Sequence, residues 1–442
     1  MDKFALVYSE ILKDFNMDAR VYQHIATKAT VVKFISSDPN MTFSISFRTP
    51  AINDKGITHI IEHSVLCGSD NYTTKEPFAD LLRVSYQNFL NAFTAPDWTM
   101  YPLSSMNKVD YENLMKIYLD AVFLPRVRKD KFPFLQEGWR WEEVAEEQNE
   151  SGHCHAPHEC CGNCTEPHSA ETHTTSNDKH HLTTNGVVLN EMKNSETDPN
   201  TICTRAICRE LYTGTYYNVS GGVPSAIETL SYAELQDFYY KHYTPSNSVT
   251  VLYSPECVLV EEFEILDHYF TLIGVTEKRA CGESTPHIIV GEPTSKRECL
   301  YLEYPIGEED DVENNDTFVC AWKLGEVDYE TSFALDSIQK IVEAKEGNKF
   351  VEKLTELGIA KSIVISYDSD LKNPYFVIFA KNANGNKFDE FQKVLLEEFE
   401  EFGRNGFGRE KEISAINTFE FEEKECEYGS FPKGVLLAMK TT

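Results

Sequence analysis

No apolar run in this 442-residue chain reaches membrane-spanning length, and basic residues are scarce relative to acidic ones. Lysine and arginine number 41 against 71 aspartate and glutamate residues, which gives a formal charge of −30. That charge argues against nucleic acids and membrane surfaces as partners, and it favours cationic ones. The N-terminus lacks both the Arg-rich, acid-poor composition of a transit peptide and the apolar core of a secretory signal. We therefore expect a cytoplasmic protein, unless a leader has already been removed.

A disulfide framework is not indicated either, although the chain has twelve cysteines. Eight are scattered singly, as buried thiols of an intracellular protein would be. The other four fall within eleven residues of a polar, His/Cys-rich stretch at 150–184: Cys154, Cys160, Cys161 and Cys164. Seven of the thirteen histidines lie between 153 and 181. We predict that this insertion is a loop, and its thiolates form a candidate second, soft-metal site.

The rest of the sequence predicts an α+β protein of two units that repeat one plan. An alternating strand at 42–48 precedes a turn and a short helix, and a similar strand at 317–323 precedes a helix at about 332–345. The first unit is placed at 1–270, with the insertion at 150–184, and the second at 285–442. Further elements expected in the first unit are strands at 31–35 and 249–253 and helices at 78–89, 111–123 and 231–242.

The motif that carries chemistry is His59-Ile60-Ile61-Glu62-His63, in the short helix of the first unit. The two histidines are four residues apart, so one helical turn stacks both imidazoles within reach of a single ion. Glu62 lies on the same side and is placed to act on water rather than on the metal. This HxxEH order is typical of inverzincin metallopeptidases, in which a zinc-activated water attacks the peptide and the glutamate is the general base. The corresponding positions of the second unit hold no such ligands, so that unit is expected to be degenerate and non-catalytic: Ala334, Ser337 and Ile338.

A catalytic zinc usually takes three protein ligands, so the HxxEH pair needs a third from elsewhere. The best candidate is Glu191, because an apolar run at 187–189 leads directly into a short polar helix there. Glu196 and Asp198, further along the same segment, are alternatives, either as the ligand or as groups that orient one.

Eight segments, in the same order along the chain, resemble the presequence-protease and falcilysin branch of the pitrilysin-type zinc peptidases. They are residues 59–69, 75–78, 89–97, 118–123, 136–139, 186–193, 220–222 and 429–434. The resemblance implies that His59, His63 and Glu191 bind one zinc ion and that Glu62 is the general base. It also implies that Asn91 and Ala92 belong to an edge strand along which extended substrate peptides pair by β-augmentation.

The resemblance further implies the architecture and the partners. The family fold is an α/β sandwich in which helices cover an antiparallel sheet, and two such units form one half of a clamp around a chamber. Family members degrade short, unfolded peptides, including cleaved targeting sequences whose basic character would suit an acidic chamber. A second chain, or a missing C-terminal half, is expected to close the chamber. A mitochondrial or related organellar location is also implied.

Three functions of different classes are therefore open. The leading hypothesis is a zinc endopeptidase acting on short unstructured peptides, with the activity of this chain alone in question. The second is a non-catalytic or partner-dependent subunit that binds or processes peptides. The third is a metal-binding protein that acts through the Cys/His-rich insertion.

Overall fold

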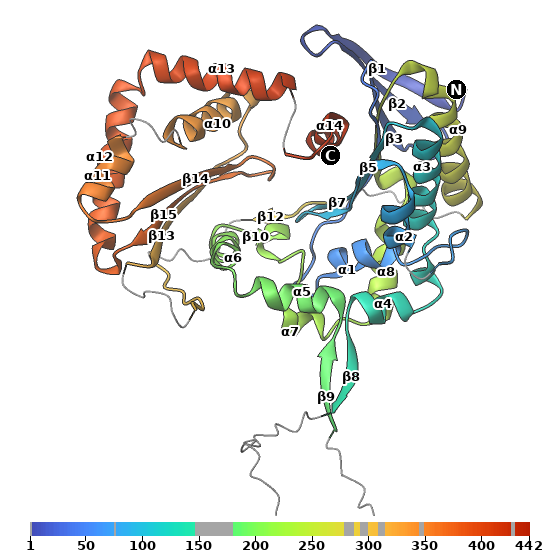
Figure 1. Cartoon of the computed structure of the whole chain (residues 1–442), viewed down its shortest axis with the longest axis horizontal. Coiled ribbons are helices and arrows are strands. Elements are labelled where there is room, and N and C mark those ends of the chain that lie inside the picture. Colours follow the sequence, from blue (N-terminus) through green and yellow to red (C-terminus); the bar gives the residue numbers. More distant parts are fainter. Residues whose placement is uncertain are drawn as a thin grey trace, which may run out of the picture.

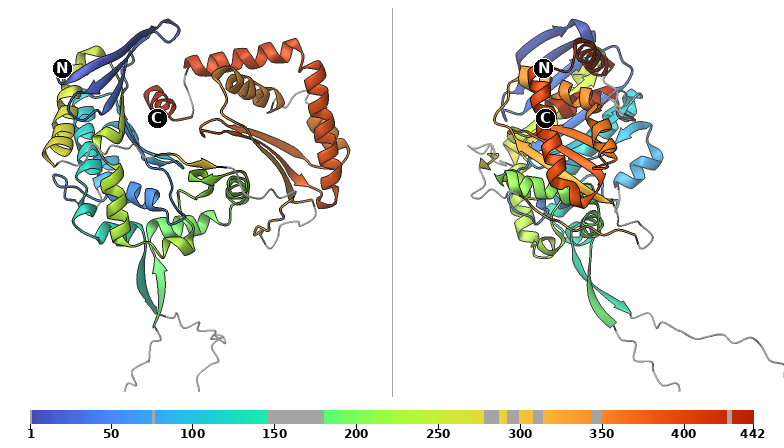
Figure 2. Two further views of the ribbon diagram at one scale, coloured as in Figure 1. Left: turned by 180° about the vertical axis from the view of Figure 1, so that it is seen from behind. Right: turned by 90° about the vertical axis from the view of Figure 1, so that its left-hand side faces the viewer.

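The computed structural model describes residues 2–74, 77–145, 180–277, 287–291, 299–307, 314–343, 349–425 and 429–442. Its elements form two groups that lie side by side, one built on an eight-stranded sheet and the other on a three-stranded sheet (Figure 1). A hairpin of β8 (Arg140–Ala145) and β9 (His180–Asn185) projects away from both groups (Figure 2). The loop predicted at 150–184 is wrong at its end, because residues 180–184 belong to β9 and pair with β8.

The larger sheet has the strand order β1-β2-β3-β11-β4-β7-β5, and β6 also pairs with β7. All neighbouring strands are antiparallel except β3 and β11, which are parallel. The bounds are β1 (Phe4–Leu12), β2 (Met17–His24), β3 (Thr30–Ile35), β4 (Met41–Arg48), β5 (Gln87–Leu90), β6 (Phe93–Thr94), β7 (Trp98–Ser105) and β11 (Ser248–Ser254).

Helices cover both faces of the centre of this sheet, which is why β4 is buried along almost its whole length. On one face, Phe43 and Phe47 of β4 join a large apolar core with helices α1, α3, α8 and α9. On the other face, small polar residues let α14 approach closely, since a Cβ added at Gly434 would lie 2.4 Å from Thr42 Oγ1. The bounds are α1 (Ile57–Val65), α3 (Lys108–Phe123), α8 (Tyr232–His242), α9 (Leu259–Phe270) and α14 (Lys433–Thr441).

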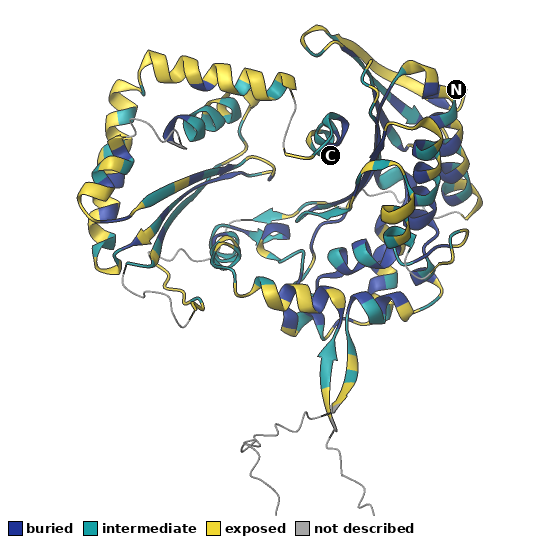
Figure 3. Ribbon diagram, viewed as in Figure 1, coloured by how far each residue is buried: buried dark blue, intermediate teal, exposed yellow. Residues whose placement is uncertain are grey.

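The smaller sheet has the order β13-β15-β14 and is antiparallel throughout. Its apolar core includes Phe318, Ile378 and Phe391 and lies between the sheet and its helices. The outer helices α12 and α13 are largely exposed (Figure 3). The bounds are β13 (Asp316–Lys323), β14 (Ser362–Asp368), β15 (Tyr375–Ala383), α10 (Tyr329–Glu343), α11 (Lys349–Glu356), α12 (Phe388–Asn405) and α13 (Arg409–Glu425).

A third apolar cluster joins the two groups of elements. Tyr212 and Tyr216, which follow α6 (Pro199–Leu211), pack with Tyr375 and Val377 of β15. The tyrosine hydroxyls also bond across this junction, because Tyr212 Oη donates to the carbonyl of Asn373 at 2.5 Å.

The predicted strands at 31–35, 42–48, 249–253 and 317–323 are confirmed by β3, β4, β11 and β13. The helices predicted at 111–123 and 231–242 correspond to α3 and α8, and the capping box of Ser231 and Glu234 is present. The helix predicted at 78–89 is wrong at its end: α2 (Pro77–Val84) stops early, and Gln87–Leu90 form β5. Pairing with β7 gives this segment backbone hydrogen bonds that a local periodicity cannot reveal.

The boundary between the two predicted units, at 270–285, remains a prediction. Helix α14 belongs to the predicted second unit by its position in the sequence, but it packs on the larger sheet, which the first unit forms. Among the residues placed in the structure, no helix combines the length and apolar character needed to cross a bilayer.

Candidate metal centre

The HxxEH residues lie on α1, whose apolar side is fixed in the protein core. Ile57, Ile60, Ile61 and Val65 are at most 5% exposed. Because these positions follow the helical repeat, they direct the two histidines of the motif to the other side of the helix. The HxxEH segment is therefore a short helix that buries one face and presents its ligand-type side chains on another.

Glycines bring the start of α1 against the loop that contains Ser220-Gly221-Gly222. Gly56 precedes the helix with φ = 65°, a left-handed conformation that favours glycine. A Cβ on Gly56 would lie 2.6 Å from the Gly221 carbonyl oxygen, so only hydrogen fits there. Thr58 Oγ1 donates to the Ser220 carbonyl at 3.0 Å. These contacts place the loop beside the His59 ring.

A second pair of glycines positions α5 (Val187–Ser195), which carries Glu191. A Cβ on Gly186 would lie 2.0 Å from the Gly138 carbonyl oxygen, so the start of α5 is packed directly on the end of α4 (Phe132–Glu137). Val188 and Leu189 are fully buried. The Glu191 side chain is 54% exposed and lies next to α1.

The structure brings together the three ligands that the sequence predicts. Glu191 Oε2 lies 3.6 Å from His59 Nε2 and 3.8 Å from His63 Nε2. The two imidazole rings are 4.9 Å apart, with 82° between their planes. A donor atom from each of the three residues lies within 4.8 Å of the other two, and within the described ranges no other group of three His, Cys, Asp or Glu meets this condition.

These residues fit a zinc ion. Four-coordinate zinc with N and O ligands at about 2.0–2.2 Å separates its ligand atoms by about 3.4 Å. The observed separations of 3.6 and 3.8 Å are close to that value. Two imidazoles and a carboxylate also form the type of donor set found in catalytic zinc sites that keep one position open.

The two imidazoles differ in their electrostatics. Burial lowers the pKa of His59, although Glu62 and Glu191 oppose this effect. Burial also acts against the cation of His63, but the hydrogen bond with Glu137 and the neighbouring carboxylates outweigh it and raise the pKa of His63. A neutral imidazole is the form that binds metal, so His59 is already in the ligand state at neutral pH.

Glu62 is positioned by a residue that the sequence did not identify. Glu62 is only 8% exposed, and its Oε2 atom accepts a hydrogen bond from Thr94 Oγ1 at 2.5 Å. Thr94 lies on β6, the short strand that pairs with the edge of β7. The carboxylate is thus tied to the sheet edge, and it is near enough to both histidines to favour their protonated forms.

Glu137 is the second residue that sequence reasoning missed. Its Oε2 lies 3.2 Å from His63 Nδ1, on the ring nitrogen opposite Nε2. Both Thr94 and Glu137 fall within segments that carry the family resemblance, at 89–97 and 136–139. Their position in these segments was a signal in the sequence that both residues have a role at the site. Their contacts with Glu62 and His63 depend on the fold and could not be predicted from the sequence.

The other predicted site residues have these surroundings. Asn91 and Ala92 lie between β5 and β6, and the backbone N–H of Asn91 donates to the Pro102 carbonyl of β7. Glu196 pairs with Arg205 at 3.3 Å, and Asp198 caps α6 by accepting from the amide of Thr201. A ligand-orienting role for Glu196 or Asp198 and the peptide-binding role of Asn91 and Ala92 remain predictions. The four clustered cysteines lie outside the described residues: Cys154, Cys160, Cys161 and Cys164.

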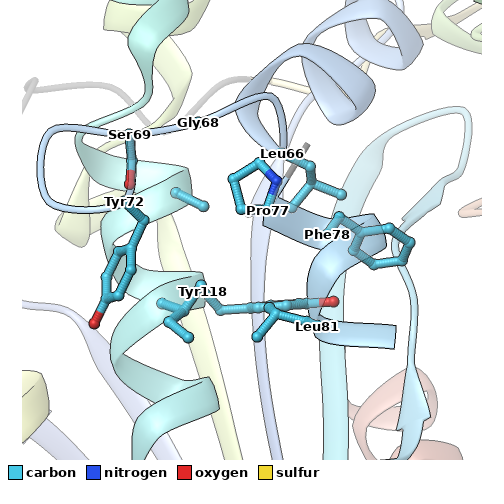
Figure 4. Close-up of a pocket in the computed structure, with 10 residues that line it drawn as sticks. Leu66, Gly68, Ser69, Tyr72, Pro77, Phe78, Leu81 and Tyr118 are labelled. Carbon is cyan, nitrogen blue, oxygen red and sulfur yellow. The ribbon is translucent and has the colours of Figure 1, made fainter. Parts of the chain in front are cut away.

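A small apolar pocket opens where α1 ends, three residues after His63. Leu66, Phe78, Leu81 and Tyr118 line it, and Figure 4 shows these side chains converging between α2 and α3. Tyr118 Oη donates to the carbonyl of Asn91 at 3.3 Å, which connects the pocket to the segment between β5 and β6.

Comparison with known proteins gives relatives along almost the whole chain. It is similar to the Protein HypA of Clostridium perfringens, with 34% identity over 99% of this chain and 41% of that protein. It is also similar to the chloroplastic/mitochondrial Presequence protease 1 of Arabidopsis thaliana (30% identity, 99% and 38% covered) and to the mitochondrial presequence protease of Schizosaccharomyces pombe (32% identity, 95% and 39% covered). The chain thus spans about two fifths of the length of these relatives.

The family model described as "Peptidase M16 inactive domain" matches residues 229–417. His59, Glu62, His63 and Glu191 all precede that stretch. The word "inactive" therefore applies to a part of the chain that does not contain the candidate metal centre.

Solved structures show the same fold. A protease from Helicobacter pylori matches with a TM-score of 0.65 and 13% identity, covering 96% of this chain and 86% of that one. Pitrilysin matches with a TM-score of 0.61 and 12% identity, covering 97% of this chain and 41% of that one. The predicted α+β fold of the pitrilysin type is therefore confirmed.

Proposed function

The chain belongs to the pitrilysin-type (M16) peptidases, and from that premise we propose that it carries the catalytic site of a zinc endopeptidase that cleaves short, unstructured peptides. The observation that supports this most is the convergence of His59, His63 and Glu191 beside the Glu62 carboxylate. These three side chains would hold the ion. When bound, zinc supplies Lewis acidity that polarises the scissile carbonyl and makes water acidic near neutral pH.

In this proposal, Glu62 is the general base and then the general acid. Its carboxylate takes a proton from the attacking water and delivers it to the nitrogen of the departing amine. Thr94 Oγ1 donates to one oxygen of that carboxylate, which leaves the second oxygen as the proton acceptor. The peptide would lie extended along the edge formed by β5 and β6, with main-chain hydrogen bonds supplying affinity that does not depend on sequence.

The proposed substrates are short basic peptides such as targeting sequences. Two of the relatives are named presequence proteases, and the formal charge of −30 favours the approach of cationic peptides. An organellar location, named in those relatives, and the cytoplasmic location expected above are alternatives that cell fractionation separates.

A partner-dependent activity is the second candidate. Because the chain spans about two fifths of its relatives, a further polypeptide would close the chamber around the bound peptide. In that case the chain alone binds zinc and peptide with little turnover, and adding the remaining portion of a relative restores cleavage.

The test combines metal content with turnover of a quenched basic peptide. One zinc per chain, abolished in His59→Ala, together with cleavage that is lost in Glu62→Gln while zinc is kept, is the result expected of the endopeptidase. Zinc binding without cleavage until the remaining portion is added indicates the partner-dependent form. Absence of zinc from the folded chain in excess metal would refute both.

A further inference from the structure

We propose that Glu137 is a positioning residue for the metal centre, which fixes the His63 ring so that Nε2 points towards Glu191 and His59. The inference rests on the proposed zinc-dependent function, because it assigns a role in holding one of the proposed ligands. The two ring nitrogens of His63 point in different directions, and each lies near a different carboxylate: Nδ1 near Glu137 and Nε2 near Glu191.

The geometry separates the tasks of these two nitrogens. Nε2 of His63 lies 3.8 Å from Glu191 Oε2, on the side where the ion would bind. Nδ1 lies 3.2 Å from Glu137 Oε2, within hydrogen-bonding distance. If Nδ1 carries the proton and donates it to Glu137, the lone pair of Nε2 is free to bind metal. A carboxylate on Nδ1 therefore selects both the tautomer and the direction of the ring.

The Glu137 carboxylate is itself held in place. Its side chain is 9% exposed, so it needs hydrogen-bond donors to remain stable as an anion. The other oxygen, Oε1, accepts from Gln136 Nε2 at 2.8 Å and from the thiol of Cys67 at 3.3 Å. Cys67 lies four residues after His63, so donors from both α4 and the end of α1 converge on this group.

The backbone around Glu137 is equally constrained. A Cβ on the next residue, Gly138, would lie 2.8 Å from the Phe134 carbonyl oxygen and 3.2 Å from a methyl group of Ile60 on α1. The end of α4 is thereby packed on the helix that carries both histidines. Rotation of the His63 ring would break the bond to a carboxylate that cannot follow it.

A role for Glu137 as an additional metal ligand does not fit this geometry. It approaches the ring nitrogen that faces away from Glu191, and within the described part of the chain the residues whose donor atoms converge are His59, His63 and Glu191 alone. His59 has no equivalent support, since its Nδ1 lies beside the Gly221 backbone instead of a carboxylate. The two ligands are thus oriented by different means.

The experiment measures zinc affinity by competition with a chromophoric chelator, using Glu137→Gln and Glu137→Ala in the full chain. Loss of a group that orients a metal ligand typically weakens metal binding about 10–100-fold. We expect about tenfold for Gln, which keeps an oxygen near Nδ1, and about 100-fold for Ala. Glu261→Gln is the matched control, because that glutamate pairs with Lys108 at the surface and should bind zinc as the wild type does.

Cobalt substitution adds a readout that a merely structural role would not change. The visible spectrum of bound Co²⁺ reports the arrangement of its ligands, and we expect it to shift in both Glu137 variants and not in Glu261→Gln. If Glu137→Ala does not fold, the zinc affinity and cobalt spectrum of the isosteric Glu137→Gln variant test the proposal. Wild-type zinc affinity together with an unchanged cobalt spectrum in the folded variants would overturn the proposal. If the wild-type chain itself binds no zinc, the proposed function fails instead.

Discussion

Thr94 Oγ1 donates a hydrogen bond of 2.5 Å to Glu62 Oε2, which connects the sheet edge to the carboxylate of the HxxEH motif. The two residues are 32 positions apart and come from β6 and α1. A hydrogen bond to an ionised carboxylate is stronger than one between neutral groups. The strand that would receive the peptide therefore also sets the orientation of the proposed base.

Replacing Thr94 by valine should lower kcat for peptide cleavage about tenfold while zinc content stays at the wild-type level. The substitution keeps the shape and removes a hydrogen bond worth about 1.5 kcal/mol, which corresponds to about a tenfold change in rate. Steady-state kinetics with the quenched peptide, in whichever assembly is active, measures the effect. Thr94→Ser retains the hydroxyl and should keep most of the activity. Equal kcat for the valine and serine variants would contradict a role in orienting Glu62.

The sequence predicts two of the three metal ligands because their relationship is local. His59 and His63 are one helical turn apart, and the apolar residues between and beside them specify a helix with a buried side. Glu191 is 128 residues from His63, and two signals identified it: the apolar run at 187–189 that leads into a short polar helix, and the family resemblance of the segment 186–193. The structure then places all three side chains together.

What the sequence could not supply are contacts between distant segments. Glu137 meets His63 across 74 positions, and nothing in the local pattern of either residue encodes that distance. The same limit explains β5, where Gln87–Leu90 continue a helical periodicity but pair with β7 as an edge strand. Strand pairing depends on the neighbour, so local propensity is a weak guide at such an edge.

The core of the larger sheet contains an ion pair whose disruption should be costly. Lys33 Nζ lies 2.6 Å from Glu262 Oε2, and both side chains are fully buried. Tyr111 and Ser254 hydroxyls donate to the other carboxylate oxygen at 2.8 and 2.6 Å. Lys33→Met leaves the carboxylate buried without its cation, and we expect the free energy of unfolding to fall by about 3–5 kcal/mol.

Urea denaturation measures this loss, and two further variants test its origin. Lys108→Met breaks an exposed pair with Glu261 and should cost less than about 1 kcal/mol. The double variant Lys33→Met/Glu262→Gln removes the uncompensated charge and keeps an acceptor for both hydroxyls, so it should recover part of the stability. If Lys33→Met lowers the free energy of unfolding by no more than Lys108→Met does, the buried pair contributes little to stability.

The stability of the protein should depend on the hydroxyl of Tyr216 more than on that of Tyr212. Tyr216 Oη donates to Asp97 Oδ2 at 2.9 Å and accepts from the amide of Lys372 at 3.0 Å. Tyr216→Phe leaves the buried Asp97 carboxyl group and the part-buried amide of Lys372 without that partner, at a cost of about 2 kcal/mol. Tyr212→Phe removes one bond, to Asn373, and should cost about 1 kcal/mol. Comparable urea midpoints for the two variants would contradict this ranking.

His242 should make the protein less stable as the pH falls below neutrality. Burial lowers the pKa of His242 to about 4, while its Nδ1–H donates to the Phe238 carbonyl at 2.9 Å. Below the unfolded pKa of about 6.5, the unfolded chain binds a proton that the folded chain does not, so stability decreases as pH falls from 6.5 towards 4. Between pH 7 and pH 5 this contribution is about 2 kcal/mol.

The measurement is the free energy of unfolding at pH 7 and pH 5 for the wild type and for His242→Gln. Glutamine can still donate to the Phe238 carbonyl but does not titrate in this range, so the variant should lose about 2 kcal/mol less than the wild type on acidification. Other groups titrate equally in both proteins, and the comparison therefore isolates His242. The same pH dependence in both would mean that His242 is protonated as readily in the folded state as in the unfolded chain.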